Sequence, residues 1–458
     1  MDFFKQDLIG FIGNAIVAIL LLLLVYSIIV SAQEKEKRAA IRLFFVFLAL
    51  AVFGIILNLI TGFLPAALVW GVFVSLFFLI VIILLAPWPE KALDVDFSKE
   101  EKIDERTIMF SRSELKPDTQ NYEAYYANHP EHLEADNKWR DSHGLLDEKS
   151  LFYNPYLFAA ADASFYAVSG LHAKTDGQVA EKIADLNTKE FTRFVKNWGK
   201  EMGCHSIGIT QLQDSHLYSY GGRRHNYNEK VVNKHPVAIA FTVEMSFDRV
   251  AAAPRAPIIQ ESASQYLNSG IIAVQLAAFL RNLGYSARAH IDGKYQVRCP
   301  QVARDAGLGQ LGRMGILMTP KLGPRVRIGV VTTNAPLEIV ENKVDNSVIR
   351  FCQICKKCAD TCPAQAISFD DRKVRNGSLQ WNIKQEECFS YWCKVGTDCG
   401  RCVATCPYSH PNNLLHNTIR LCIRRSPLFR QLAYRLDDWL YGRKPPSREL
   451  PDWMNAKN

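Results

Sequence analysis

Cysteines are scarce outside one short stretch of the chain, and this scarcity argues against a protein stabilised by disulfides. Nine of the twelve cysteines lie between Phe351 and Pro407. The remainder offers no framework of paired cysteines, so we expect a reducing compartment. The chain also lacks a large basic block interleaved with aromatic residues, although its formal net charge is +8. This excludes a typical nucleic-acid-binding protein, and we expect no nucleic acid partner.

Charged side chains and histidines are missing from three long apolar runs in the first 90 residues. Each run is long enough to span a membrane, since roughly 20 residues cross the hydrocarbon core. Without Asp, Glu, Lys, Arg or His, the runs show neither a proton path nor haem ligands. We predict an anchor; a quinol-facing module is the alternative. The three runs are Leu8–Ile29, Leu43–Leu64 and Ala67–Leu85.

The first apolar run does not read as a signal for export. A cleavable signal peptide does not fit, because two further spans follow the first. No Arg-Arg pair of a twin-arginine signal precedes the first span. The loop between the first two spans carries Lys35, Lys37, Arg38 and Arg42, whereas the loop around 61–65 has no charge. Because positive loops stay cytoplasmic, we predict that everything after Trp88 lies on the cytoplasmic side of the inner membrane.

The stretch from Phe351 to Pro407 has the cysteine spacing of a protein with two [4Fe-4S] clusters. In this pattern three closely spaced cysteines bind one cluster, and the cysteine before a proline crosses to the other. The predicted ligands of the first cluster are Cys352, Cys355, Cys358 and Cys406, and those of the second are Cys362, Cys388, Cys399 and Cys402.

Other uses of these cysteines fit the spacing poorly. Zinc sites use two separate pairs of cysteines, and disulfides between such close cysteines would be strained. Thiolates suit iron because they are soft, electron-rich ligands. The stretch contains two runs of cysteines, Cys352–Cys362 and Cys388–Cys406. Cys393 lies inside the second run but outside the ligand pattern, and we predict that it is a spare thiol.

The residues between the apolar runs and the cysteine stretch predict a mixed α/β domain. Val237–Val243 and Val326–Thr332 are rich in β-branched residues and bounded by turn residues, which is typical of strands. Tyr266 to Asn282 carries apolar residues at helical spacing and is followed by Gly284, a residue that commonly ends a helix.

Four glycines lie close together after this helix, and two interpretations of them stay open. They form either a plain glycine-rich turn or a loop that lets the backbone approach a cofactor closely. As a dinucleotide-binding fingerprint they are a weak match, because no strand–turn–helix unit surrounds them. The four are Gly307, Gly309, Gly312 and Gly315.

Taken together, several motifs resemble those of the reductive dehalogenases, which are corrinoid and iron–sulfur enzymes. The resemblance covers roughly residues 151–446, and the epoxyqueuosine reductases share the same core. The motifs are the glycine stretch, the double cysteine run with Cys388-Phe-Ser-Tyr391-Trp392, and the segments Gly284-Tyr285-Ser-Ala-Arg288, Thr319-Pro320, Gly323-Pro324-Arg325-Val-Arg327 and Asp437-Asp438 through Tyr441-Gly442-Arg443-Lys444.

The resemblance implies base-off cobalamin, bound between the α/β core and the cluster domain, and an organohalide substrate. The proton donor of the family is a tyrosine just before a helix, and Tyr266 occupies the matching place. Its pKa would be lowered by a nearby cation. Arg325 matches the arginine beside that tyrosine, with Arg327 as a neighbour, and Asp292 is a third candidate. The alternative for Tyr266 is a packed aromatic at the start of a helix.

Two departures from the family stand out. Members of the family usually carry a twin-arginine signal and are held at the membrane by a small separate anchor protein. This chain instead resembles such an anchor and the enzyme fused into one protein. The signature by which other cobalamin proteins ligate cobalt through histidine is absent. Asp214-Ser-His216 begins like it but lacks the glycine, and we interpret this likeness as chance.

The predicted fold is an α/β (α+β) corrinoid-binding core with a ferredoxin-like double [4Fe-4S] domain, preceded by three transmembrane helices. The basic tail suits a helix that lies on an anionic leaflet or, alternatively, packs on the core. The predicted domains are a three-helix anchor at 1–90, a linker and surface-wrapping segment at 91–150, the catalytic core at 151–345, the cluster domain at 346–410 and a basic helical tail at 411–458.

The sequence therefore predicts a multi-pass inner-membrane reductive dehalogenase that faces the cytoplasm. Its expected partners are an organohalide, membrane lipid, and an electron donor that is a quinol or a reduced ferredoxin or flavodoxin. Two alternatives stay open. One is an epoxyqueuosine-type corrinoid reductase, and the other is a membrane-bound iron–sulfur electron-transfer protein without catalysis.

Overall fold

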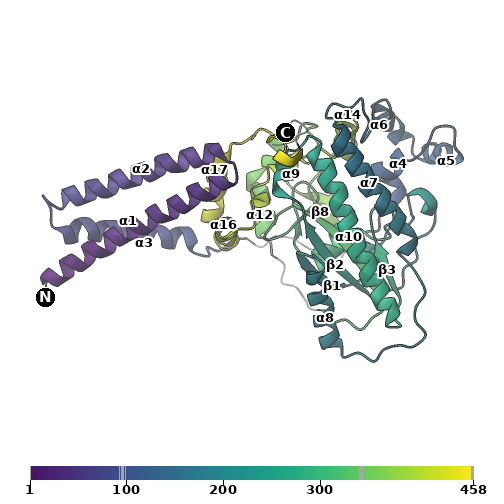
Figure 1. Ribbon diagram of the computed structural model, residues 1–458, viewed down its shortest axis with the longest axis horizontal. Helices are drawn as coiled ribbons and strands as arrows, with labels where there is room; N and C mark the ends of the chain where they lie inside the picture. The colour runs from purple at the N-terminus through teal and green to yellow at the C-terminus, as the bar shows by residue number, and fades with distance from the viewer. Residues whose placement is uncertain (1, 92, 94–96, 98, 340–344, 455–458) are drawn as a thin grey trace. The chain divides into compact units, whose positions relative to one another are not determined.

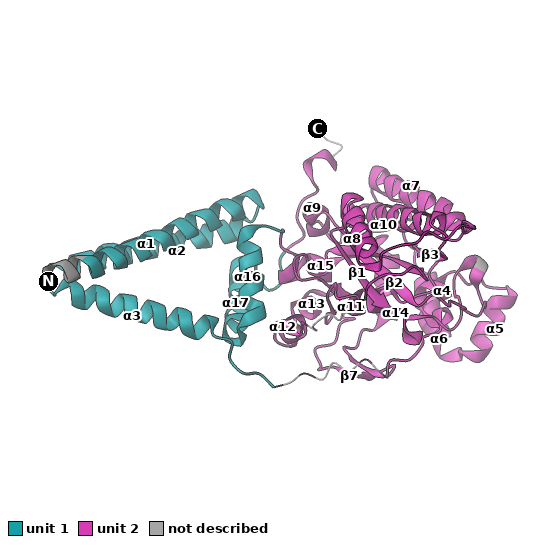
Figure 2. Ribbon diagram, turned by 90° about the horizontal axis from the view of Figure 1, so that it is seen from below, with its two compact units in different colours: residues 1–92, 412–445 teal, residues 93–411, 446–458 magenta. Residues whose placement is uncertain are grey.

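The chain forms two compact units in the computed structural model (Figures 1 and 2). Unit 1 contains residues 1–92 and 412–445, and unit 2 contains residues 93–411 and 446–458. The structure describes residues 2–91, 93, 97, 99–339 and 345–454. Residues 92, 94–96 and 98 of the predicted linker, 340–344 of the predicted core and 455–458 of the predicted tail lie outside the described residues.

Unit 1 begins with three long apolar helices, α1 (Asp2–Gln33), α2 (Lys37–Ile60) and α3 (Ala66–Leu85). All three are long and apolar enough to cross a membrane, as the sequence predicted. The second helix ends at Ile60, four residues before the predicted end of the second span. Pro65 disfavours helical backbone in the residue before it, and the connection from Thr61 to Pro65 is a turn.

Two shorter helices from the end of the chain belong to the same unit. They are α16 (Leu414–Arg425) and α17 (Pro427–Tyr441), and Figure 2 shows them running across the ends of the apolar helices. Ser426 separates them, because its backbone is extended and its hydroxyl accepts a hydrogen bond from the amide of Phe429. A proline at the first helical position then starts α17.

The packing of α1 against α3 depends on a glycine. A Cβ atom at Gly13 would lie 2.1 Å from the ring of Trp70, which is 1% exposed. We expect Gly13→Ala to destabilise unit 1 by about 1–3 kcal/mol, because the added methyl group would overlap the buried indole ring. Gly71→Ala is the matched control, since nothing lies within 4 Å of its Cβ position. Thermal unfolding in detergent checks this; equal melting temperatures for the two variants would contradict it.

The core of unit 2 is a four-stranded antiparallel sheet. Its strands are β1 (Ser206–Gln211), β2 (Val237–Glu244), β6 (Val326–Thr333) and β3 (Ala287–His290), in that order across the sheet. The two strands predicted from the sequence are β2 and β6, which pair along their full length. The predicted mixture of helices and strands is therefore confirmed.

Helices cover both faces of this sheet, and alternate residues of β2 separate the two cores. Ile239 and Phe241 pack with residues of α8 (Thr188–Glu201) and α10 (Pro257–Asn282). Ala238 and Ala240 pack with α11 (Cys299–Asp305) on the opposite face. Successive side chains of a strand point to opposite faces, so a strand buried along nearly its full length is continuously apolar. A further helix, α7 (Pro155–Leu171), packs along α10.

Helix α10 starts nine residues earlier than the sequence predicted. Pro257 stands in its first turn, where proline is favoured because its fixed φ suits the first turn and its missing N–H is not needed there. Its end at Asn282 agrees with the prediction, and Gly284 follows with a φ of +88°. Tyr266 therefore lies well inside the helix, and its predicted place just before a helix is wrong.

Residues 346–410 fold into short helices and a hairpin. The elements are α12 (Ser347–Cys355), α13 (Lys357–Thr361), β7 (Lys373–Arg375), β8 (Ser378–Gln380), α14 (Gln385–Val395) and α15 (Arg401–Ala404). Elsewhere in unit 2 lie α4 (Met109–Ser113), α5 (Gln120–Asn128), α6 (Pro130–Arg140), α9 (Phe247–Ala251), β4 (Gln310–Leu311) and β5 (Leu317–Met318). Short 3₁₀ turns occur at 105–107, 172–174, 214–216, 224–226, 407–409 and 452–454.

The segment predicted to wrap the surface is anchored on α14. Trp139 of α6 is 3% exposed, and its ring centre lies 5.1 Å from that of Phe389. Arg112 of α4 is fully buried between Asp136 at 3.1 Å and Glu386 at 2.9 Å. Because a buried charge is costly unless it is paired, these two carboxylates fix α4 and α6 on the cluster domain.

A buried carboxyl group predicts a pH dependence of stability. Glu105 is 5% exposed and accepts a hydrogen bond from the amide of Gly222 at 2.8 Å. Burial raises its pKa from 4.5 to about 7. Between these values the folded chain holds a proton that the unfolded chain has lost, so the free energy of unfolding falls as pH rises through this interval.

We expect Glu105→Gln to remove this dependence and to stabilise unit 2 above pH 7 by up to about 3 kcal/mol. Unfolding followed between pH 5 and pH 8 checks this. Glu101→Gln, at an exposed neighbouring position, should keep the parent's pH dependence. An unchanged slope in the Glu105 variant would contradict the prediction.

Candidate functional site

Four buried thiols gather where α12 and α13 meet the end of the second cysteine run. Burial raises the pKa of the Cys406 thiol well above its usual range, and the nearby thiols of Cys352, Cys355 and Cys358 raise it further. Between α12 and α13 the chain turns at Lys356, which has a left-handed φ of +53°. This turn closes the chain around the three local cysteines. The structure thus brings together the four residues predicted as ligands of the first cluster.

A second group of thiols is formed by the four remaining predicted ligands. The pKa of Cys402 is raised well above its usual range by burial and by the neighbouring Cys399, Cys388, Cys358 and Cys362. Cys358, a member of the first group, appears among these neighbours, so the two groups adjoin each other. The pKa of Cys399 is likewise raised, first by burial and then by Cys388.

The donor chemistry of both groups fits iron–sulfur clusters. All of these cysteines are free thiols, and each is buried or partly buried. Buried thiols with raised pKa values are costly to ionise in isolation, whereas a bound metal deprotonates them outright. Cys393 differs, because it packs with Trp139 and Phe389 in an apolar cluster and burial raises its pKa to about 11. This position agrees with its predicted role as a spare thiol.

Arg313 is a buried cation beside the first group that the sequence did not single out. Its guanidinium is fully buried and donates to the carbonyl oxygens of Cys352 at 3.0 Å, Ser368 at 2.7 Å and Asp370 at 2.9 Å. Burial lowers its pKa, and the thiols of Cys358 and Cys352 act against that change. A fixed positive charge at this position favours the ionised thiolate form of the neighbouring Cys352 and Cys358. Its position between two motif glycines was the available signal.

Three glycines of the predicted cofactor loop, Gly309, Gly312 and Gly315, make close contacts within the chain. A Cβ at Gly309 would lie 2.1 Å from the carbonyl oxygen of Met318, and one at Gly315 would lie 2.4 Å from Ile383. At Gly312 it would lie 2.6 Å from Met318 and 3.6 Å from Sγ of Cys352. Gly307 and Gly315 have positive φ angles of 78° and 74°. Internal packing therefore explains these glycines, and their contact with a corrinoid stays a prediction.

A polar cluster surrounds Tyr266 on α10. The guanidinium of Arg327 lies over its ring, 4.6 Å from the centre. Arg327 also pairs with Asp398 at 3.0 Å and donates to the hydroxyl of Ser262. Asp398 directly precedes Cys399, so the residue that holds the arginine is joined to the second thiol group. Nε of Arg327 and Oδ1 of Asp398 have no hydrogen-bond partner within the described part of the chain.

The charges around Tyr266 oppose one another. Arg327 lowers the pKa of the phenol and is the largest influence, but burial together with Asp292 and Asp398 outweighs it and leaves the pKa raised. The expected net lowering is therefore not found. A raised pKa keeps the phenol protonated at neutral pH, which is the form that a proton donor needs.

Asp292 belongs to the same electrostatic neighbourhood. Burial raises its pKa, and Arg223 and Arg327 act against that change. The backbone carbonyl of Asp292 forms a 2.7 Å hydrogen bond with Nε2 of His172. The structure thus brings Tyr266, Asp292 and Arg327 within electrostatic reach of one another.

Arg325 has different neighbours from those expected. It is 1% exposed and donates to Glu244 at 2.8 Å, to the carbonyl of Ser409 at 3.0 Å and to the carbonyl of Met245. The cation over Tyr266 is Arg327, two residues further along the chain. Arg325 instead ties the end of β2 to the segment after the second cysteine run, and its predicted position beside the tyrosine is wrong.

Comparison with known proteins supports the predicted resemblance. Residues 351–410 match the family of 4Fe-4S dicluster domains. The tetrachloroethene reductive dehalogenase of Sulfurospirillum multivorans is 30% identical over 299 residues, covering 57% of this chain and 59% of that protein. A catabolic reductive dehalogenase solved with 3-bromo-4-hydroxybenzoic acid has a TM-score of 0.64 at 21% identity, covering 80% of this chain and 54% of that one.

An epoxyqueuosine reductase of Lactococcus garvieae matches a shorter stretch. It is 30% identical over 113 residues, which cover 24% of this chain and 31% of that protein. The chain spans less than two thirds of the length of each of these relatives. The comparisons confirm that the chain has homologues among the reductive dehalogenases and shares their fold.

Proposed function

We propose that this homologue of the reductive dehalogenases is a membrane-anchored enzyme that removes halide from an organohalide with cobalamin and two [4Fe-4S] clusters. The observation that carries the proposal is the junction between the second thiol group and the polar cluster. Asp398 holds Arg327 over Tyr266 and is followed immediately by Cys399. A proposed cluster ligand and the proposed proton donor are thus linked through Asp398 and Arg327, which supports a reaction that couples electrons to a proton.

The contacts of His216 support a corrinoid that would bind without this histidine as a cobalt ligand. His216, in the fragment that begins like a cobalt-ligating signature, is fully buried. Its Nε2 forms a 2.7 Å hydrogen bond with Asp305, and its Nδ1 accepts one from the amide of Gln213. Both ring nitrogens are therefore engaged within the chain. When bound, a reduced corrinoid supplies a strong nucleophile and reductant toward the carbon–halogen bond.

The chain's own residues would hold the corrinoid and donate the proton that replaces the halogen. Gly307, Gly309, Gly312 and Gly315 are the proposed lining of its site, and the orphan polar atoms of Arg327 and Asp398 suit an amide or a substrate oxygen. Tyr266 would hold the proton that replaces the halogen. Arg327 would fix the ring by its position over it, and Asp292 would help to keep the phenol protonated.

The reaction balances with two electrons and one proton for each halide released. We propose that the electrons come from a quinol or from reduced ferredoxin or flavodoxin. Cys352, Cys355, Cys358 and Cys406 would hold one cluster, and Cys362, Cys388, Cys399 and Cys402 would hold the other, and these clusters would supply the electron transfer. Tyr266 supplies the proton. Reprotonation from solvent restores the phenol for the next turnover.

We place the catalytic unit on the cytoplasmic side of the inner membrane. Lys35 lies just before α2, and the first turns of α2 carry Lys37, Arg38 and Arg42, whereas the connection between α2 and α3 carries no charge. Positively charged ends of membrane helices stay on the cytoplasmic side. A reporter enzyme fused after Asn458 tests this. Activity of a cytoplasmic reporter supports the orientation, and activity of a periplasmic reporter alone would overturn it.

The activity itself is tested by anaerobic halide release with a chemically reduced viologen as electron donor. The panel should contain a chlorinated ethene and a brominated hydroxybenzoate, because relatives are named for or solved with these two classes. Release of chloride or bromide from either class supports the proposal. An enzyme loaded with both cofactors that is inactive on all halides but reduces an epoxide in transfer RNA would favour the epoxyqueuosine alternative.

A further inference from the structure

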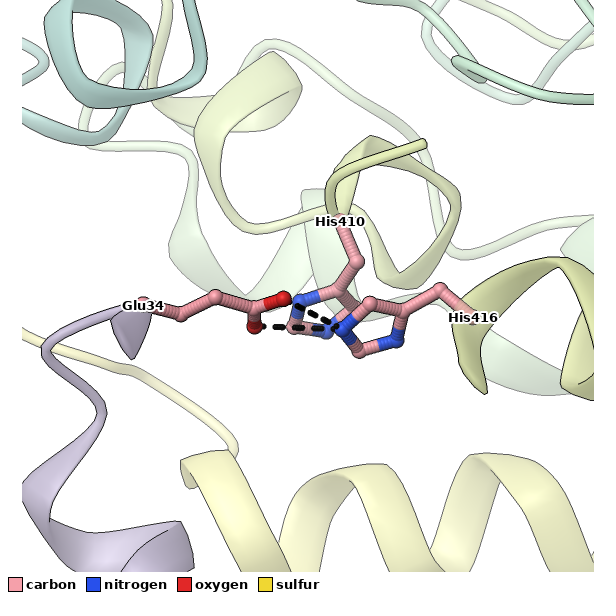
Figure 3. Close-up of side chains that lie close together, drawn as sticks. All are labelled: Glu34, His410 and His416. Carbon is pink, nitrogen blue, oxygen red and sulfur yellow. Dashed lines mark hydrogen bonds and ion pairs between the residues drawn. The ribbon is translucent and has the colours of Figure 1, made fainter. Parts of the chain in front are cut away.

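The helices α16 and α17, here called the tail hairpin, are attached to one end of the membrane helices by three separate contacts. The first contact is at the end of α1. Both carboxylate oxygens of Glu34 lie 3.1 Å from Nε2 of His416 (Figure 3). Nδ2 of Asn413 donates to the same carboxylate at 2.8 Å. Glu34 and His416 are both buried, so this contact is a fixed part of unit 1.

The second and third contacts involve the start of α2 and the exit from α3. Arg42 donates to the carbonyl of Trp439, and its guanidinium lies 5.2 Å from the centre of the indole ring. Past the end of α3, Glu90 receives a two-pronged ion pair from Arg430, at 2.6 and 3.3 Å. All three contacts lie at the same end of the apolar helices, which is the end that carries Lys35, Lys37, Arg38 and Arg42.

Each helix of the tail hairpin has a buried face and an exposed face. In α16, His416, Arg420 and Ile423 are buried, while Leu414, Leu421 and Arg425 are exposed at intervals of seven and four residues. These intervals place the three exposed residues on one side of a helix with 3.6 residues per turn. The exposed side is therefore apolar and basic rather than uniformly polar.

The same division occurs in α17. Arg430, Ala433 and Asp437 are buried. Leu428, Arg435, Leu436 and Trp439 are exposed and fall on the opposite side of the helix. Because Arg42 meets the indole ring of Trp439, the exposed face of α17 begins beside α2, a helix long and apolar enough to cross a membrane.

We infer that the tail hairpin is an interfacial membrane element whose exposed faces lie among the headgroups of anionic phospholipids. Tryptophan at the boundary, leucines beside it and arginines that extend toward phosphates are the composition of such helices. The arginines exposed on the hairpin are Arg424, Arg425 and Arg435, whereas its Asp437 is buried. This balance of charge matches an anionic surface, and the three contacts hold it at the level where that surface begins.

Photo-crosslinking in lipid nanodiscs tests this inference on the full chain. A benzophenone amino acid replaces Leu421 or Leu436, which are 45% and 41% exposed. Leu22 in α1, 68% exposed, is the positive control, and Tyr166 in α7 of unit 2, 82% exposed, is the negative control. The discs contain equal amounts of phosphatidylcholine and phosphatidylglycerol, and mass spectrometry identifies the adducts. Only variants with the iron content and elution volume of the parent are compared.

We expect lipid adducts at Leu421, Leu436 and Leu22 and none at Tyr166. Adducts at the two hairpin positions should favour phosphatidylglycerol. Arg425→Glu together with Arg435→Glu should reduce that preference by about fivefold or more, since each basic residue near the surface contributes about 1 kcal/mol. Adducts to a second copy of the chain, absence of lipid adducts at both hairpin positions, or an unchanged lipid preference in the double variant would overturn the inference.

Discussion

Replacing Tyr266 by phenylalanine should reduce halide release by about 10²–10⁴-fold, the usual contribution of a positioned general acid. The substitution removes only the hydroxyl, so the ring stays under Arg327 and the α10 helix is unchanged. Burial and the carboxylates of Asp292 and Asp398 keep this phenol protonated. Steady-state halide release at saturating donor measures the effect.

The control is Tyr156→Phe, at a 69% exposed tyrosine of the same unit, which should keep the parent's rate. The parent and the two variants must contain equal amounts of cobalt and iron, so that a lower rate reflects a slower chemical step and not the loss of a cofactor. If Tyr266→Phe retained full activity at normal cofactor content, the proton donor would be another group. The assignments of Arg327 and Asp292 around it would then also fail.

Replacing Cys358 by alanine should remove about half of the iron, from about eight to about four atoms per chain, because one four-iron cluster loses a ligand. Halide release should fall to the level of protein without clusters, since the electron path is interrupted. Iron analysis and the electron paramagnetic resonance of the reduced protein measure the loss. One of two cluster signals should disappear.

Cys393→Ala is the matched control, because Cys393 is equally buried in the same domain but packs in an apolar cluster. It should keep all the iron and most of the activity. Loss of iron in this variant, or full iron in the Cys358 variant, would contradict the assignment of the ligands.

The features that depend on local spacing could be predicted from the sequence. The three apolar helices follow from uninterrupted apolar runs, and the thiol groups follow from intervals of two and three residues that curl the chain around a cluster. The β2 and β6 strands were recognisable because both lie in the middle of the sheet and are rich in apolar and β-branched residues. The pattern also predicted the end of α10 at Asn282, since Gly284 follows it.

The features that depend on distant pairing could not be predicted in this way. The contact of Arg327 with Asp398 joins residues 71 positions apart, and that of Glu34 with His416 joins residues 382 apart. The helical and strand periodicities of the sequence relate only nearby residues, so they do not predict either pair. The motif contains both Arg325 and Arg327, and only the fold decides which guanidinium reaches the ring of Tyr266.

The measurement that tests the central claim most directly is the cofactor content of the full chain, purified anaerobically in detergent from a corrinoid-producing host. The account predicts about one cobalt and about eight irons per chain, bound as one corrinoid and two [4Fe-4S] clusters. About eight irons without cobalt, despite a supply of corrinoid, would contradict the account. That result would identify the chain as an iron–sulfur electron-transfer protein.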